Sequence, residues 1–118
     1  MQGTRMARLT VELQQEIARI IHQELKDPRL GFVTITRLSL SNDLRYAKVF
    51  FSCLGGEAAR ASSQEALDHS TGFIHGLIKR RFRLKVIPEL QFRYDASIEG
   101  SIALSEKLDQ FRHPPPRA

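Results

Sequence analysis

The chain has 118 residues, of which 42% are hydrophobic, so it can bury the core of one domain but not of two. Its single cysteine excludes an intrachain disulfide, and none of its apolar runs is long enough to cross a bilayer. The formal net charge of +5 favours an anionic partner such as nucleic acid. Residues 1–10 lack the apolar core of an export signal, so a cytoplasmic location is expected.

The first predicted element is an amphipathic helix from about Arg5 to Leu25. Pro28 ends it, because proline disfavours the helical conformation of Asp27, and Gly31 frees the turn that follows. The apolar residues of the helix recur at spacings of three and four: Leu9, Leu13, Ile17, Ile20, Ile21 and Leu25.

Two strands are predicted next, and the turn residues between them indicate an antiparallel hairpin. Residues 33–40 begin with a β-branched run, and residues 46–53 alternate apolar and polar side chains. Ser41, Asn42 and Asp43 supply the turn. Cys53 ends the second strand and is interpreted as a small core residue rather than a nucleophile.

The remaining elements are helical, apart from one strand. Residues 57–69 and the residues after Gly72 predict two helices separated by a kink, and residues 89–94 predict a third strand. A last helix is expected over residues 97–111, followed by a proline-rich disordered tail at 113–118. The order predicts an α+β fold, an α/β sandwich with a small three-stranded mixed sheet and helices on one face.

Positive charge is concentrated between residues 69 and 94. This segment contains six Lys and Arg against the single acid Glu89, which leaves twelve of each sign in the rest of the chain. Ser70, Thr71 and Gly72 precede the basic run, where the second of the two helices is expected to start. Free N–H groups at a helix start attract phosphate, and neighbouring cations neutralise it. A solvated basic helix end is an equally good interpretation of the charge alone.

Four ordered blocks carry a family resemblance that extends from about Glu16 to Leu108. The chain resembles the ribosome-binding factor A family of bacterial small-subunit assembly factors. The resemblance implies a type II KH-like RNA-binding domain over residues 1–112, with the order helix-strand-strand-helix-kink-helix-strand. The blocks are Leu25–Gly31, Ser41–Val49, Gly72–Leu84 and Ile87–Ser97.

The kink is where this resemblance places the RNA site. Ordinary KH domains clamp the nucleic-acid backbone with a GxxG loop. The family is similar to this chain in lacking that loop and has an Ala-x-Gly kink instead, in which Ser70 here replaces alanine. The rRNA-binding residues expected from the kink and the basic run are Ser70, Thr71, Gly72, His75, Lys79, Arg80, Arg83, Lys85 and Arg93.

The function implied by the resemblance is binding of the free small (30S) ribosomal subunit and its 16S rRNA late in assembly. The factor would act near the decoding region and the 5′-terminal helix, assist processing of precursor rRNA and matter most in the cold. It would work as a monomer without a cofactor, metal, small-molecule substrate or membrane. Release would involve a small GTPase or initiation factor three.

The sequence also bears on two other classes of function. A protein–protein adaptor would use the basic face for an acidic partner. An enzyme is disfavoured because the four histidines lack metal-ligand spacing and no catalytic constellation is visible. Gly72 fits both close helix packing and phosphate approach. Tyr46 and Phe50 either stack on bases or, as we expect, pack beneath the C-terminal helix.

Overall fold

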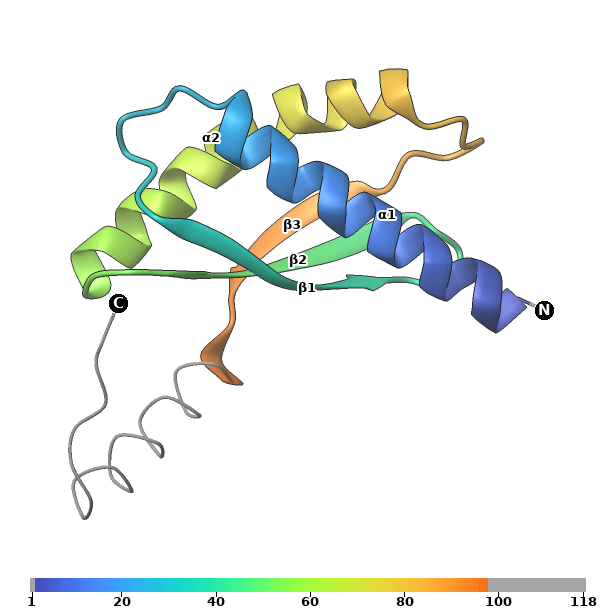
Figure 1. Ribbon diagram of the computed structural model, residues 1–118, viewed down its shortest axis with the longest axis horizontal. Coiled ribbons are helices and arrows are strands. Elements are labelled where there is room, and N and C mark those ends of the chain that lie inside the picture. The colour runs from blue at the N-terminus through green and yellow to red at the C-terminus, as the bar shows by residue number, and fades with distance from the viewer. Residues whose placement is uncertain (1, 98–118) are drawn as a thin grey trace, which may run out of the picture.

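The computed structural model describes residues 2–97, and within this range two helices cover one face of a three-stranded sheet (Figure 1). The central strand β2 pairs antiparallel with β1 and parallel with β3. The predicted α+β class, mixed sheet and one-sided helices are therefore confirmed. The elements in chain order are α1 (Gln2–Gln23), β1 (Val33–Leu40), β2 (Tyr46–Cys53), α2 (Glu57–Arg81) and β3 (Glu89–Tyr94). The helix expected over residues 97–111 lies outside the described residues except for Ser97, and the tail at 113–118 lies outside them entirely.

The core lies between the helices and the sheet, because each strand alternates buried and exposed side chains. Ala47, Val49 and Phe51 of β2 have no exposed surface, and Leu90 and Phe92 of β3 face the same side. The apolar stripe of α1 covers this face through Leu13, Ile17, Ile20 and Ile21. Burial of this apolar surface provides most of the free energy that holds helices on the sheet.

The helix α1 begins and ends earlier than its apolar periodicity predicts. It starts at Gln2 and stops at Gln23, whereas the prediction was Arg5 to Leu25. Leu25 still packs against the core, and its N–H donates to the Ile20 carbonyl at 3.2 Å. Periodicity located the buried face correctly but did not define the helix ends.

The helix α2 is one uninterrupted helix of 25 residues rather than the two expected, so the predicted kink does not break it. Its first and second halves nevertheless run in different directions in Figure 1, so the axis bends near its middle. The Thr71 hydroxyl donates to the Leu67 carbonyl at 3.0 Å, a local contact that commonly bends helices. Ser70 is a buried residue within α2 and does not stand at a helix start.

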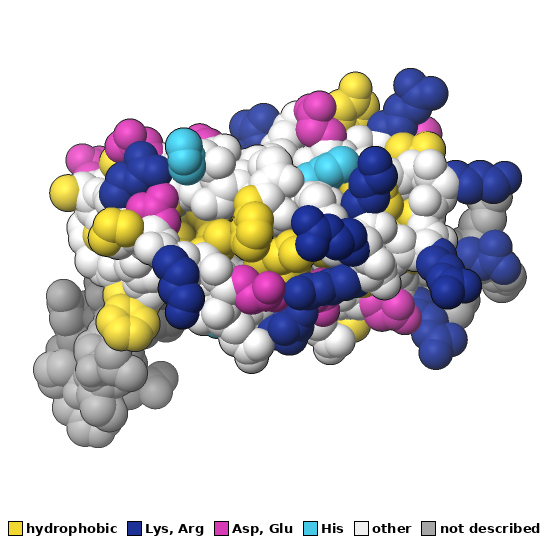
Figure 2. Space-filling view, turned by 90° about the horizontal axis from the view of Figure 1, so that it is seen from above, with side chains coloured by type: hydrophobic (Ala, Val, Ile, Leu, Met, Phe, Trp, Pro, Cys, Tyr) yellow, Lys and Arg dark blue, Asp and Glu magenta, His cyan; other side chains and the backbone are white. Residues whose placement is uncertain are grey.

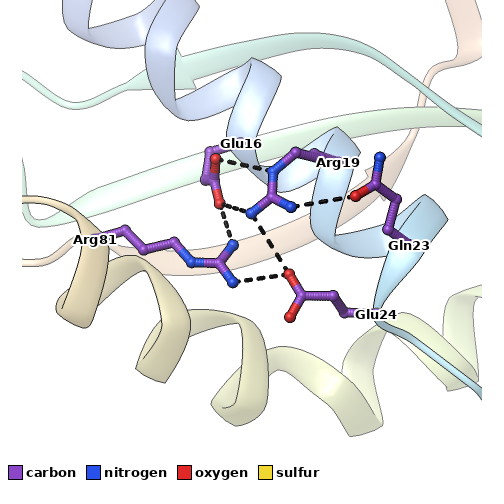
Figure 3. Close-up of polar contacts among 5 residues, drawn as sticks. All are labelled: Glu16, Arg19, Gln23, Glu24 and Arg81. Carbon is purple, nitrogen blue, oxygen red and sulfur yellow. Dashed lines mark hydrogen bonds and ion pairs between the residues drawn. The ribbon is translucent and has the colours of Figure 1, made fainter.

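Four charged side chains join the C-terminal half of α1 and the residue after it to the end of α2 (Figure 3). Arg81, the last residue of α2, contacts Glu16, and its Nη2 donates to Glu24 Oε2 at 2.9 Å. Arg19 Nη2 lies 2.5 Å from Glu16 Oε2. Arg19, and then Arg81, hold the pKa of Glu16 below its ordinary value. Arg81 therefore lies on the side of α2 that faces α1, and its side chain bridges the two helices.

Asp95 links the outer strands of the sheet, which do not pair with each other. Its carboxylate is 2% exposed and accepts the Thr36 hydroxyl of β1 at 2.6 Å. The same carboxylate accepts two hydrogen bonds from Ser97, which follows β3: one from the Ser97 N–H at 3.1 Å and one from the Ser97 hydroxyl at 2.5 Å. The bonds from Ser97 and then Thr36 lower the pKa of Asp95 to about 2. Thr36 lies at the irregularity between Ile35 and Arg37, which brings its hydroxyl to the carboxylate.

The turn between β1 and β2 holds one residue in an uncommon conformation. Leu44 has a φ of +63°, although it is not glycine. The turn is closed by Asp43, whose carboxylate accepts the Ser41 hydroxyl at 2.7 Å and the Arg45 N–H at 3.1 Å. Local hydrogen bonds thus hold a backbone geometry that leucine alone would not favour.

The bridge between α1 and α2 predicts different effects for two adjacent arginines. Arg81→Met should lower the melting temperature by a few degrees, because Glu16 and Glu24 lose their partner on α2. Arg80→Met should leave it nearly unchanged, since Arg80 is exposed and forms no ion pair with any described residue. Thermal denaturation at low and high salt measures both, and the deficit of Arg81→Met should shrink as salt screens the charges. Equal effects of the two substitutions would contradict the bridge.

The pKa of Asp95 predicts a loss of stability in acid. A carboxyl whose folded pKa is depressed stabilises the fold above its unfolded pKa, so this contribution is present from about pH 4 upward. It is lost as the pH falls through the folded value of about 2. Asp95→Asn should therefore be less stable than the parent at pH 7, with the difference narrowing toward pH 2. Urea denaturation across this range measures the difference, and a constant gap would show that the charge of Asp95 is not what stabilises the fold.

Candidate nucleic-acid interface

Four exposed cations follow one another at the C-terminal end of α2 and in the loop after it. Lys79 and Arg80 lie in the last turn of the helix, and Arg83 and Lys85 lie in the loop to β3. None of the four forms an ion pair within residues 5–97. We call these four residues the basic run. Figure 2 shows that Lys and Arg side chains gather toward the end of the molecule where α1 begins and α2 ends.

The helix end beside the basic run is not the kind of end that the sequence predicted. Because α2 is continuous, the basic run lies at a helix C-terminus, whose partial charge is negative. Phosphate therefore finds no free N–H groups at Gly72, and that part of the predicted site is wrong. Attraction for an anion comes from the four side chains alone.

A groove of about 560 Å³ lies beside the middle of α2. It is bounded by α2, by the start of β2 and by the segment that leads into β3. The structure brings three of the predicted site residues together here with residues of the other elements. Residues lining the groove include Arg45, Tyr46, Thr71, Gly72, His75 and Ile87.

Gly72 is exposed in this groove, and a Cβ built on it would meet no atom within 4 Å. The close-packing interpretation of this glycine is therefore wrong, because no neighbouring helix approaches it. What glycine provides is a smooth, open wall. A ligand can approach the α2 backbone there without meeting a side chain.

His75 is held in place on the groove wall. Its Nε2 lies 3.4 Å from the Ile87 carbonyl oxygen, a distance at which a protonated nitrogen donates a hydrogen bond. The contact connects α2 to the segment before β3. His75 is half-buried, so one edge of the ring remains available to a ligand.

Arg45 and Tyr46 line the groove but are not among the predicted site residues. Arg45 is exposed, and Tyr46 keeps 49% of its surface exposed. The register of the parallel pair places Tyr46 beside Glu89, which brings the start of β2 to the start of β3. The sequence resemblance covers both residues, but only the fold shows that they line the same groove as Gly72. The expected packing of Tyr46 and Phe50 beneath the C-terminal helix involves residues outside the described range.

Two other predicted site residues lie away from the basic run. Ser70 is buried between α2 and the sheet and does not line the groove. Arg93 points to the sheet face opposite the helices, because Leu90 and Phe92 on the same strand point toward them. Its register partner on β2 is Phe50, which carries the Arg37 guanidinium 3.8 Å above its ring. We therefore remove both from the candidate interface.

Other chemistry finds little support in the described residues. Cys53 packs against the core as predicted, and burial raises the pKa of its thiol. In residues 2–97 no three His, Cys, Asp or Glu side chains are grouped so that they could hold a metal ion. No helix in the same range is long and apolar enough to span a membrane.

Comparison with known proteins gives a consistent assignment. The family model described as ribosome-binding factor A matches residues 5–108. Ribosome-binding factor A of Heliobacterium modesticaldum is 43% identical over 113 residues, which cover 96% of this chain and 93% of that protein.

Solved structures agree with the sequence comparison. A putative ribosome-binding factor A of Thermotoga maritima, solved by NMR, matches with a TM-score of 0.67 and 40% identity. The match covers 74% of this chain and 83% of that one. A Thermus thermophilus ribosome-binding factor A homology model, fitted into a cryo-electron microscopy map of its 30S complex, matches with a TM-score of 0.63. It is 27% identical, and the match covers 75% of this chain and 93% of that one.

The open wall at Gly72 predicts a separation between stability and RNA affinity. Gly72→Val should change the free energy of unfolding by less than about 0.5 kcal/mol, since glycine and valine differ little in helix propensity. It should lower RNA affinity severalfold, because the branched side chain fills the groove. Gly76→Val is the matched control in the same helix. Gly76 also has no atom within 4 Å of a built Cβ, but it does not line the groove.

Urea denaturation and binding to purified small-subunit rRNA measure the two properties. A loss of RNA affinity for Gly76→Val as large as that for Gly72→Val would show that the groove is not the ligand site. Loss of stability at Gly72 with normal affinity would restore the packing interpretation.

Proposed function

This chain belongs to the ribosome-binding factor A family, and from that premise we propose that it binds the small ribosomal subunit through its rRNA. The Thermus relative in a 30S complex supports this proposal, because its fold matches over three quarters of this chain. The family model spans nearly the whole sequence, including the basic run and the groove.

The observation that carries the proposal is the unpaired charge of the basic run. Glu16 and Glu24 hold Arg81, the fifth cation at this end of α2, whereas Lys79, Arg80, Arg83 and Lys85 remain available. RNA presents phosphates at regular intervals, and neutralising them releases condensed counterions. Cations from a helix end and the loop after it can follow an RNA backbone past the groove that contains Gly72.

The groove supplies the second half of the proposed contact. Tyr46 offers an exposed ring on which a base can stack, and Thr71 and His75 add polar groups at its edge. We propose Thr71, Gly72, His75, Arg45 and Tyr46 as the groove residues of the rRNA site. The basic run would hold the adjoining phosphates.

The proposed action is selective binding rather than catalysis. A protein that binds one rRNA conformation more tightly shifts the rRNA toward it by that difference in affinity. We propose that the selected conformation is a late state near the decoding region and the 5′-terminal helix of 16S rRNA, from which precursor ends are processed. The chain would act as a monomer in the cytoplasm. The need for it should be greatest in the cold, where misfolded RNA helices escape slowly.

The basic run predicts a specific salt dependence. With about four phosphates neutralised, the logarithm of the affinity should fall with the logarithm of salt at a slope of about −3 to −3.6. Changing Lys79, Arg80 and Arg83 together to alanine should flatten the slope by about two to three units and weaken binding. Filter binding to free small subunits over a salt series measures this, and the melting temperature should stay unchanged because all three side chains are exposed.

The same triple variant provides the test in cells. A deletion strain carrying it should accumulate precursor 16S rRNA, and the protein should no longer sediment with free small subunits. A protein–protein adaptor predicts no affinity for bare rRNA above that of any cationic protein, and normal rRNA ends. Those results would overturn the proposed function.

A further inference from the structure

A second cleft lies at the opposite end of α1 from the Arg81 bridge, and its volume is about 790 Å³. Three parts of the chain form it: the first turns of α1, the turn between β1 and β2, and the loop after α2. Its apolar floor comes from Met6, Leu9, Leu44 and Leu84. Arg5 and Arg8 also line it, and both are exposed.

The cleft is continuous with the basic run. Leu84 lines the cleft, and its two neighbours in sequence, Arg83 and Lys85, belong to the basic run. Arg5 and Arg8 therefore extend the same positive surface onto α1. Figure 2 shows this concentration of Lys and Arg at one end of the molecule. Sequence alone does not reveal it, because about 75 residues separate the two groups of cations.

The cleft carries a net positive charge, because two arginines and one glutamate line it. Arg5 forms no ion pair within the described part of the chain, whereas Arg8 Nε lies 3.6 Å from Glu12 Oε1. Both side chains of that pair are largely exposed, at 82% and 53%, so water weakens their attraction. The pair can therefore open at low cost when a stronger anion approaches Arg8.

The floor contains the one described non-glycine residue with a positive φ. Leu44 adopts φ +63° and turns its apolar side chain into the cleft. Such a conformation costs on the order of 1–3 kcal/mol and is concentrated at binding sites in proteins. An asparagine would adopt it more easily, yet leucine is present and lines an open cavity.

Resting on the proposed function, we propose that this cleft binds an unpaired nucleotide of the same rRNA. Its phosphates would lie on Arg5 and Arg8, and its base would lie on the aliphatic floor. Bases that leave a helix are held in pockets by contact with apolar side chains, which this floor provides. Continuity with the basic run favours RNA over an acidic peptide, because one strand can contact both without a second partner.

Three variants of the full chain separate the parts of this proposal in binding to purified bacterial small subunits. Arg5→Ala with Arg8→Ala should weaken binding about tenfold and flatten the salt slope by about 1.4 units, the value for two single-strand phosphates. Leu44→Asn should weaken binding without changing the slope, since it removes apolar floor but keeps the backbone conformation. Glu12→Gln should strengthen binding, because it removes the only acid that lines the cleft among the described residues.

The matched control changes two exposed cations elsewhere, Lys26→Ala with Lys48→Ala. These residues lie in neither the cleft nor the groove and should leave the slope nearly unchanged. A photo-crosslinking amino acid at Met6 then identifies the occupant. Attachment to rRNA supports the proposal, and attachment to a ribosomal protein would overturn it in favour of a protein partner.

The outcomes also separate this proposal from the proposed function. If the Lys79, Arg80 and Arg83 triple variant loses affinity while the Arg5 and Arg8 double variant matches the control, only the cleft proposal fails. If the parent chain does not bind small subunits at all, the proposed function fails with it. Melting temperatures of all variants, measured beside the binding, exclude unfolding as the cause.

Discussion

The contact of Arg81 with Glu16 of α1 and with Glu24, just after α1, is the interaction on which the functional surface depends. It fixes the end of α2 against α1, so the loop to β3 must leave the helix at that point. It also assigns different roles to adjacent cations. Arg80 is exposed to solvent, whereas the charge of Arg81 is paired with Glu16 and Glu24. A continuous basic stretch of sequence therefore becomes a surface with one structural arginine and several available ones.

The bend of α2 has a similar effect on the groove. If α2 were two separate helices, the start of the second would offer phosphate a set of free N–H groups. An unbroken but bent helix keeps those groups in its own hydrogen bonds and exposes only a smooth wall at Gly72. Recognition then relies on side chains that come from other elements, such as Tyr46 at the start of β2. This explains why the groove and the basic run are neighbours but not one site built from a single loop.

The three strands could be predicted from sequence to the residue, because their alternation matches burial on one sheet face. The continuity of α2 could not be predicted, because the local preferences of Ser70, Thr71 and Gly72 favour a break. Burial of Ser70 and Ile74 on one side of the helix outweighs those preferences. Arg93 was included in the predicted site because of its charge alone. The alternation of β3 already places its side chain on the sheet face opposite that of Phe92. The cations of α1 were missed for the same reason, since in sequence they balance nearby acids. Only the fold shows that they share a cleft with Leu84.

The parallel pairing of β2 with β3 sets the order in which the fold can close. The hairpin of β1 and β2 joins residues that are close in sequence, and α1 can pack on it at once. By contrast, β3 must wait until α2 has crossed the sheet, because parallel strands need a long connection. The carboxylate of Asp95, which reaches back to Thr36, therefore engages last. The hydrogen bond between Asp95 and Thr36 therefore forms on an almost complete domain. Removing it would speed unfolding far more than it slowed folding.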